Sequence, residues 1–107
     1  MPIVTTRHFV TYSGVKLPLN LNSELTDAEI HNRITFYRAG YDASGLLLKV
    51  EKLVYGEIES FHEYQYYPDG PLQQARVVSI TEETCTLLQY AVDGSLLASE
   101  MNDYEPV

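Results

Sequence analysis

Apolar and polar residues alternate along the middle of the chain with the period of β-strands. Most even positions over residues 46–55 are apolar, and alternation resumes over residues 57–67; the apolar members are Leu46, Leu48, Val50, Val54, Ile58, Tyr64 and Tyr66. This pattern is typical of two antiparallel strands with one buried face. Folding them about Gly56 so that Val54 faces Ile58 also places Lys49 opposite Glu63. We predict this register, because a slip by one residue turns the apolar side chains to solvent.

A tyrosine-rich segment, a glycine turn and an aliphatic segment follow one another three times. The turns contain Gly45, Gly70 and Gly94, which are 25 and 24 residues apart. Such a spacing accommodates two strands and two turns per unit and lies in the range of internal repeats. We therefore predict a mainly β fold. Hairpin repeats over about residues 36–97 are expected to form an antiparallel meander sheet that is curved or partly closed.

The N-terminal third predicts a further hairpin. Residues 3–21 read as two strands joined at Ser13–Gly14. The second strand is expected to end early or to lie at an edge, because Pro18 cannot donate to a strand ladder.

One short helix is expected after this hairpin. Thr26 precedes Glu29 by three residues, which is the spacing of a capping box,. The apolar face of such a helix is small, because only Leu25, Ala28 and Ile30 contribute to it. We expect about two helical turns.

Length and charge limit the classes of function. At 107 residues, the chain is expected to form a single domain with one core and a flexible acidic tail over about residues 101–107,. The net charge is −8, and residues 57–107 hold Arg76 alone against ten acids. Direct binding to nucleic acid is disfavoured, because the chain has no basic stripe to contact phosphates.

The N-terminus and the cysteine content favour a cytoplasmic protein. Residues 1–7 lack a charged segment followed by an apolar run, so neither secretion nor membrane insertion is predicted,. The single cysteine, Cys85, excludes an internal disulfide and suits a reducing compartment,. We expect it to be a buried small hydrophobe in a strand rather than a catalytic thiol.

Two groups of motifs resemble known families. Residues 63–73, Glu-Tyr-Gln-Tyr-Tyr-Pro-Asp-Gly-Pro-Leu-Gln, resemble one unit of the bacterial YD and MORN-variant hairpin repeats. The first unit departs from the pattern, with Ser44 where the others have Asp69 and Asp93. Residues 9–19 and 52–57 are similar to a small bacterial family of single-domain proteins of unknown function. The resemblance implies a compact stand-alone domain and assigns no catalytic residues.

Candidate site residues lie mainly on the second strand of the central hairpin. The histidines and Cys85 show no spacing typical of metal ligands, so neither a metal nor a cofactor is predicted,. Phe61 is expected beside Leu47, Leu53 and Tyr55, as an apolar patch that the helix, a second subunit or a ligand covers. His62 shares the opposite face with two tyrosines. The candidate binding surface consists of Tyr55, Phe61, His62, Tyr64 and Tyr66.

These features favour a protein-interaction or binding module without catalysis. Its partner is an unknown protein or a second copy of the chain, and a homodimer would form through an exposed strand edge or the Phe61 patch. Two alternatives remain open at this point. One is an acidic mimic or inhibitor of a basic partner, and the other is a small-molecule binder with a tyrosine-lined pocket that includes His62.

Overall fold

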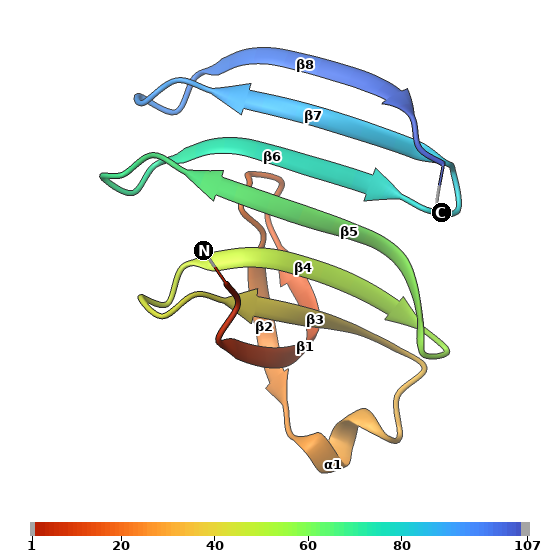
Figure 1. Cartoon of the computed structure of the whole chain (residues 1–107). Coiled ribbons are helices and arrows are strands. Elements are labelled where there is room, and N and C mark those ends of the chain that lie inside the picture. Colours follow the sequence, from red (N-terminus) through yellow and green to blue (C-terminus); the bar gives the residue numbers. More distant parts are fainter. Residues whose placement is uncertain (1, 106–107) are drawn as a thin grey trace.

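The computed structural model describes residues 2–105. Eight antiparallel strands form one sheet in the order β2-β1-β3-β4-β5-β6-β7-β8 (Figure 1). The elements are β1 (Thr5–Ser13), β2 (Asn20–Leu25), α1 (Asp27–Ile30), β3 (Thr35–Tyr41), β4 (Leu47–Val54), β5 (Glu57–Tyr66), β6 (Leu72–Ser79), β7 (Thr84–Tyr90) and β8 (Leu96–Asp103). The mainly β, antiparallel class is confirmed. The sheet is not closed, however, and β2 and β8 are its two edges.

Three of the turns share one hydrogen-bond pattern. Gly45 donates its backbone N–H to the carbonyl of Asp42, Gly70 to that of Tyr67 and Gly94 to that of Ala91, at 3.1, 2.9 and 2.9 Å. These glycines have φ of 92°, 112° and 90°, a conformation that favours glycine,. A register shift beside each turn pairs Tyr41, Tyr66 and Tyr90 with Leu47, Leu72 and Leu96. The turn geometry is therefore common to the three hairpins, while the repeat relationship of whole units stays a prediction.

The central hairpin has the predicted long-range register but a different turn. Lys49 pairs with Glu63, as expected, whereas Val54 pairs with Glu57 and not with Ile58. Tyr55 and Gly56 both have positive φ, 52° and 79°, which is the conformation of a two-residue type I′ turn,. This turn closes the hairpin on Val54 and Glu57, and an irregularity between Lys52 and Leu53 then restores the predicted register,.

The N-terminal third differs from the expectation in two ways. Residues 15–19, expected to form a strand, lie in the loop between β1 and β2. The expected two-turn helix is a single turn, α1, with Thr26 as N-cap. Thr26 Oγ1 accepts the Glu29 N–H at 3.3 Å, and Glu29 Oε1 accepts the Thr26 N–H at 3.0 Å. The helix ends after Ile30 because residues 31–33 are all polar and give a second turn nothing to bury,.

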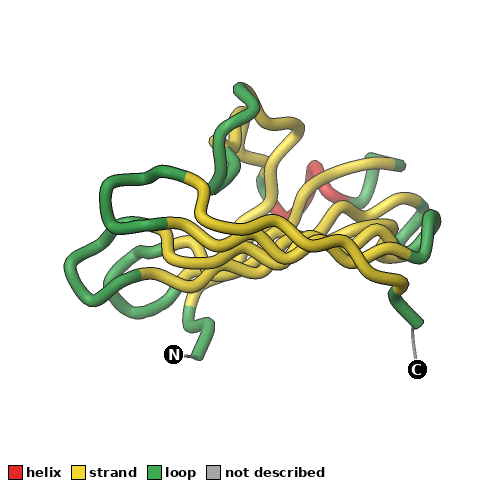
Figure 2. Tube along the Cα trace, turned by 90° about the horizontal axis from the view of Figure 1, so that it is seen from above, coloured by secondary structure: helices red, strands yellow, loops and turns green. Residues whose placement is uncertain are grey.

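The loop between β1 and β2 covers one face of the sheet. In Figure 2, this part of the chain stands over the sheet rather than continuing in its plane. Leu17 and Leu19 of the loop, together with Leu21 at the start of β2, pack on Val50, Tyr64 and Ala75. We call this the hairpin face, and the face that carries Lys49, Glu63 and Arg76 the charged face.

A smaller apolar cluster lies beside α1. It contains the buried side chains Leu25, Phe36 and Leu53, against which Ile30 and Ile58 pack. At the other end of the chain, Met101–Asp103, which the sequence placed in a loose tail, form the end of β8. The last part of that predicted tail, residues 106–107, lies outside the described residues.

Candidate functional site

The five predicted site residues do not lie together. Tyr55 lies in the β4–β5 turn and is 78% exposed. Phe61 is on the charged face. His62 and Tyr64 occupy β5 positions that point to the hairpin face, and Tyr64 and Tyr66 belong to the apolar core there. Successive side chains of a strand point to opposite faces, so the side chains of Phe61 and His62 lie on opposite sides of the sheet. The predicted surface therefore divides into separate environments.

Phe61 lies beneath charged side chains instead of in an apolar patch. Lys49 Nζ is 5.1 Å and Arg76 Cζ 5.8 Å from the centroid of its ring. Tyr104 packs edge-on against the same ring, with 6.2 Å between centroids. The expected patch is absent because Leu53 is buried beside α1 and Leu47 packs with the hairpin-face core.

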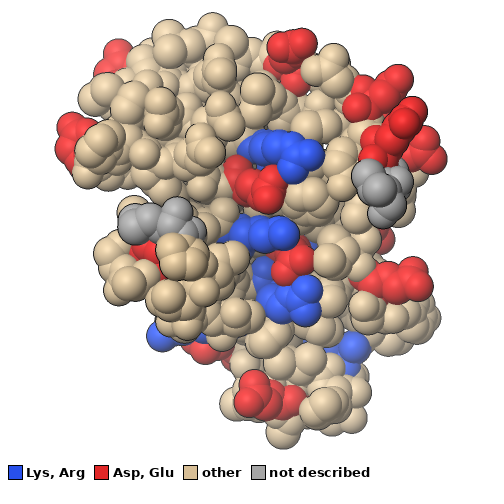
Figure 3. Space-filling view, in the orientation of Figure 1, with Lys and Arg blue, Asp and Glu red and all other residues tan. Residues whose placement is uncertain are grey.

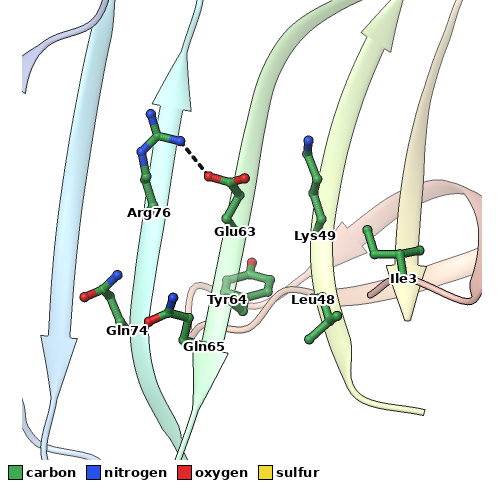
Figure 4. Close-up of a pocket in the computed structure, with 8 residues that line it drawn as sticks. All are labelled: Ile3, Leu48, Lys49, Glu63, Tyr64, Gln65, Gln74 and Arg76. Carbon is green, nitrogen blue, oxygen red and sulfur yellow. Dashed lines mark hydrogen bonds and ion pairs between the residues drawn. The ribbon is translucent and has the colours of Figure 1, made fainter. Parts of the chain in front are cut away.

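Opposite charges alternate across the charged face, as Figure 3 shows. Arg76 Nη1 lies 2.6 Å from Glu63 Oε1, and Arg38 Nε lies 2.8 Å from Glu51 Oε1. A shallow groove of about 350 Å³ lies here, between the Arg76–Glu63 pair and Ile3 (Figure 4). In this groove Arg76 contacts the Glu63 carboxylate and the Phe61 ring, and Lys49 Nζ lies over the same ring.

A hydrogen-bond chain on the hairpin face connects β5 to the loop above it. Tyr64 is 3% exposed, and its hydroxyl accepts the Leu19 N–H at 3.2 Å. The same hydroxyl lies 2.8 Å from His62 Nδ1. Among the described residues this buried hydroxyl has no other acceptor within hydrogen-bond distance, so the arrangement that satisfies its proton is donation to Nδ1,. Burial lowers the pKa of His62, so the ring is neutral and its remaining proton is on Nε2,.

His62 also lines a small recess that we call the tyrosine pocket. It has a volume of about 180 Å³, and its lining includes Tyr12, Leu19, Tyr37, Val50, Lys52, Ser60 and His62. The rings of Tyr12 and Tyr37 meet edge-to-face, with 5.5 Å between centroids. Lys52 Nζ is 3.1 Å from Glu59 Oε1. The sequence indicated His62 as a member of a tyrosine-lined pocket but did not indicate Tyr12, Lys52 or Ser60, which come from three different strands.

Other tyrosines anchor strands to one another. Tyr66 donates its hydroxyl proton to the Leu47 carbonyl at 2.6 Å, and Tyr67 donates to the Tyr90 carbonyl at 2.7 Å. Burial, followed by the nearby Asp42 carboxylate, raises the pKa of Tyr66 to about 12. Tyr66 is therefore a protonated donor committed to the fold.

Strand β8 is an exposed edge that the sequence did not reveal. All eight of its residues are exposed, with Leu97 66% and Met101 67% accessible. It pairs with β7 on one side only. The sequence prediction ended the sheet near residue 97 and assigned Met101 to the tail, so this edge was missed.

The structure gives no metal site or membrane span in its described part. Within residues 2–105, no three His, Cys, Asp or Glu side chains gather in a way that would hold a metal ion. No helix in this part is long and apolar enough to cross a membrane. Cys85 is half-buried and pairs across the sheet with Val78.

Comparison with known proteins bears on the family alone. Neither the curated proteins nor the solved structures gave a match. The sequence does match a family of unknown function (DUF6156) over residues 3–99, which is most of the chain and includes the tyrosine pocket and all strands up to the middle of β8. The predicted relationship to a family of unknown function is therefore confirmed, and the chain belongs to this family.

Proposed function

We propose that this protein is a non-catalytic interaction module that binds an extended segment of a partner protein along β8. The observation that carries the proposal is the exposure of all eight residues of this edge strand. An open edge presents unpaired N–H and C=O groups, and adding a strand to such an edge is a common mode of peptide recognition.

The backbone groups that a partner strand would meet follow from the pairing with β7. Tyr104 donates its N–H to the Glu83 carbonyl at 2.8 Å. In an antiparallel ladder the direction of the N–H alternates along the strand, and the β7–β8 register is regular from Ala98 to Asp103,. The N–H groups of Ser99, Met101 and Asp103 therefore point away from β7, and a partner strand has three donors at alternate residues.

The other edge of the sheet is less suited to strand addition. Ser23 of β2 has φ of 62°, an unusual conformation for a non-glycine residue,. The pairing of β1 with β2 skips this position, since Phe9 pairs with Glu24 and Thr11 with Asn22. An incoming strand would meet an interrupted ladder at β2 and a regular one at β8.

Charge indicates the chemistry of the partner. Residues 77–105 contain six acids, Glu82, Glu83, Asp93, Glu100, Asp103 and Glu105, and no Lys or Arg. A partner segment that combines aliphatic side chains for Leu97 and Met101 with Lys or Arg is complementary to this edge. Pairing β8 with a second copy would bring two acidic edges together, which disfavours a homodimer through β8.

A capture experiment with matched variants tests the proposal. Met101→Pro removes an outward N–H without touching the β7 ladder, whereas Val15→Pro changes a fully exposed loop position,. Wild-type protein and both variants are incubated with bacterial lysate at low and moderate salt, and retained proteins are identified by mass spectrometry. We expect a discrete partner on the wild type and on Val15→Pro, and its loss on Met101→Pro.

Two results would contradict strand addition at β8. If all three proteins retain the same set, the edge is not the binding surface. Basic proteins retained equally by all three at low salt and lost at moderate salt would favour the acidic mimic instead. Sedimentation velocity of the same samples reports self-association separately.

A further inference from the structure

The tyrosine pocket brings together polar groups that the fold does not use. Within residues 2–105, no intramolecular hydrogen bond engages the hydroxyls of Tyr12, Tyr37 or Ser60, nor Nε2 of His62. These side chains come from β1, β3 and β5 and line one recess of about 180 Å³. A recess in which several polar groups converge on apolar walls is the usual form of a small-molecule site.

His62 is fixed as a hydrogen-bond donor toward this recess. The Tyr64 hydroxyl accepts the Leu19 N–H at 3.2 Å and donates its own proton to His62 Nδ1, which lies 2.8 Å away and is its one acceptor among the described residues,. The proton of the neutral ring is therefore on Nε2. Burial also raises the pKa of Tyr37, an effect that nearby Lys52 opposes, so the Tyr37 hydroxyl keeps its proton at neutral pH. Both groups can donate to a ligand.

The charge of the pocket favours a singly charged ligand. Lys52 is the cation of its lining, and its ammonium is 3.1 Å from the Glu59 carboxylate. This pair has no net charge, and the whole chain carries −8. That excess repels a doubly charged anion more strongly than a singly charged one, and one carboxylate can accept from the neutral donors and from a Lys52 N–H that Glu59 does not use,.

The walls and the volume limit the rest of the ligand. Leu19, Val50 and the edge-to-face rings of Tyr12 and Tyr37 give the recess an apolar side. At the roughly 30 Å³ that one water molecule takes in the liquid, 180 Å³ holds a molecule of about six non-hydrogen atoms,. A short aliphatic chain with one carboxylate matches both limits.

We propose that the tyrosine pocket binds a small aliphatic monocarboxylate, whose carboxylate accepts hydrogen bonds from Tyr37, Ser60, His62 and Lys52. This site is on the hairpin face and is separate from the β8 edge. Its test is therefore independent of the interaction proposed above.

Titration followed by NMR tests this proposal on the full chain. Acetate, propionate and lactate are added to ¹⁵N-labelled protein, and backbone amide and His62 ring shifts are recorded. Acetamide is the uncharged control and inorganic phosphate the multiply charged one. Tyr37→Phe and Ser60→Ala each remove one donor, and Tyr41→Phe is the matched control because it changes a tyrosine of the same strand outside the pocket.

We expect saturable shifts confined to the pocket with propionate or lactate, and affinity about tenfold weaker in Tyr37→Phe but unchanged in Tyr41→Phe. If Tyr37→Phe does not fold, Ser60→Ala provides the same comparison. The absence of saturation up to tens of millimolar would overturn the proposal. Equal binding of acetamide would overturn the role of the charge, and tighter binding of phosphate would overturn the monocarboxylate assignment.

Discussion

The Tyr64 hydroxyl holds the β1–β2 loop on the sheet, and its removal is expected to destabilise the protein. Tyr64→Phe leaves the ring in place but deletes the acceptor for the Leu19 N–H and the donor to His62 Nδ1. Both partners are then left in a site where Tyr64 itself is 3% exposed. A hydrogen bond contributes about 1 kcal/mol net, and a stranded buried group costs about 1–3 kcal/mol.

These figures give a loss of about 2–3 kcal/mol from a total stability on the order of 5–15 kcal/mol. In urea, with a slope of about 2 kcal/mol per molar, the unfolding midpoint falls by roughly 1 M. Tyr55→Phe is the control, because Tyr55 is 78% exposed and should change stability by less than about 0.5 kcal/mol,. The reasoning is refuted if Tyr64→Phe unfolds at the same urea concentration as Tyr55→Phe.

Three further predictions concern single residues. Burial lowers the pKa of His62, so the unfolded chain takes up a proton near pH 6.5 and the folded chain only at lower pH. The free energy of unfolding should therefore decrease as the pH drops below about 6.5. Urea titrations of His62→Gln at several pH values should show a smaller decrease over this range. Gly70→Val should cost about 1–3 kcal/mol by thermal unfolding, because φ of 112° strains any β-branched residue, and a loss below about 0.5 kcal/mol would contradict the turn assignment,. Asp42→Ala should destabilise the protein more than Asp93→Ala. Asp42 is 2% exposed and accepts from the Ser44 N–H, the Ser44 hydroxyl and the Leu46 N–H, whereas Asp93 bonds Ser95 in an exposed turn. Equal unfolding midpoints of the two variants would count against burial as the cause.

The sequence predicted the strands where local alternation was strong. Residues 47–66 have the period of two strands, and the pairing of Lys49 with Glu63 followed from that period and the need to keep Val50 and Tyr64 on one buried face. The neighbouring Val54–Ile58 pair was wrong, because the prediction placed the turn at Gly56 alone. Tyr55 also adopts positive φ, which a sequence pattern does not indicate for tyrosine,.

The candidate site was less predictable than the strands. Alternation correctly separates Phe61 from His62, but it does not show what lies above each side chain. Arg76 contacts both Phe61 and Glu63. It lies on β6, and the sequence did not predict which residues of β6 pair with β5. Tyr12 and Tyr37 meet across β1 and β3, which are separated in the chain by β2 and α1.

By itself, the sequence determined the antiparallel class, the glycine turns and the family, because side-chain alternation and positive φ are properties of short segments. The tertiary structure alone decided that the β1–β2 loop crosses one face of the sheet, where Leu19 bonds a tyrosine 45 residues away. It also decided that the sheet stays open at β8. Alternation gives each strand two faces, but which face is covered, and which edge is left unpaired, depends on contacts between segments far apart in the chain.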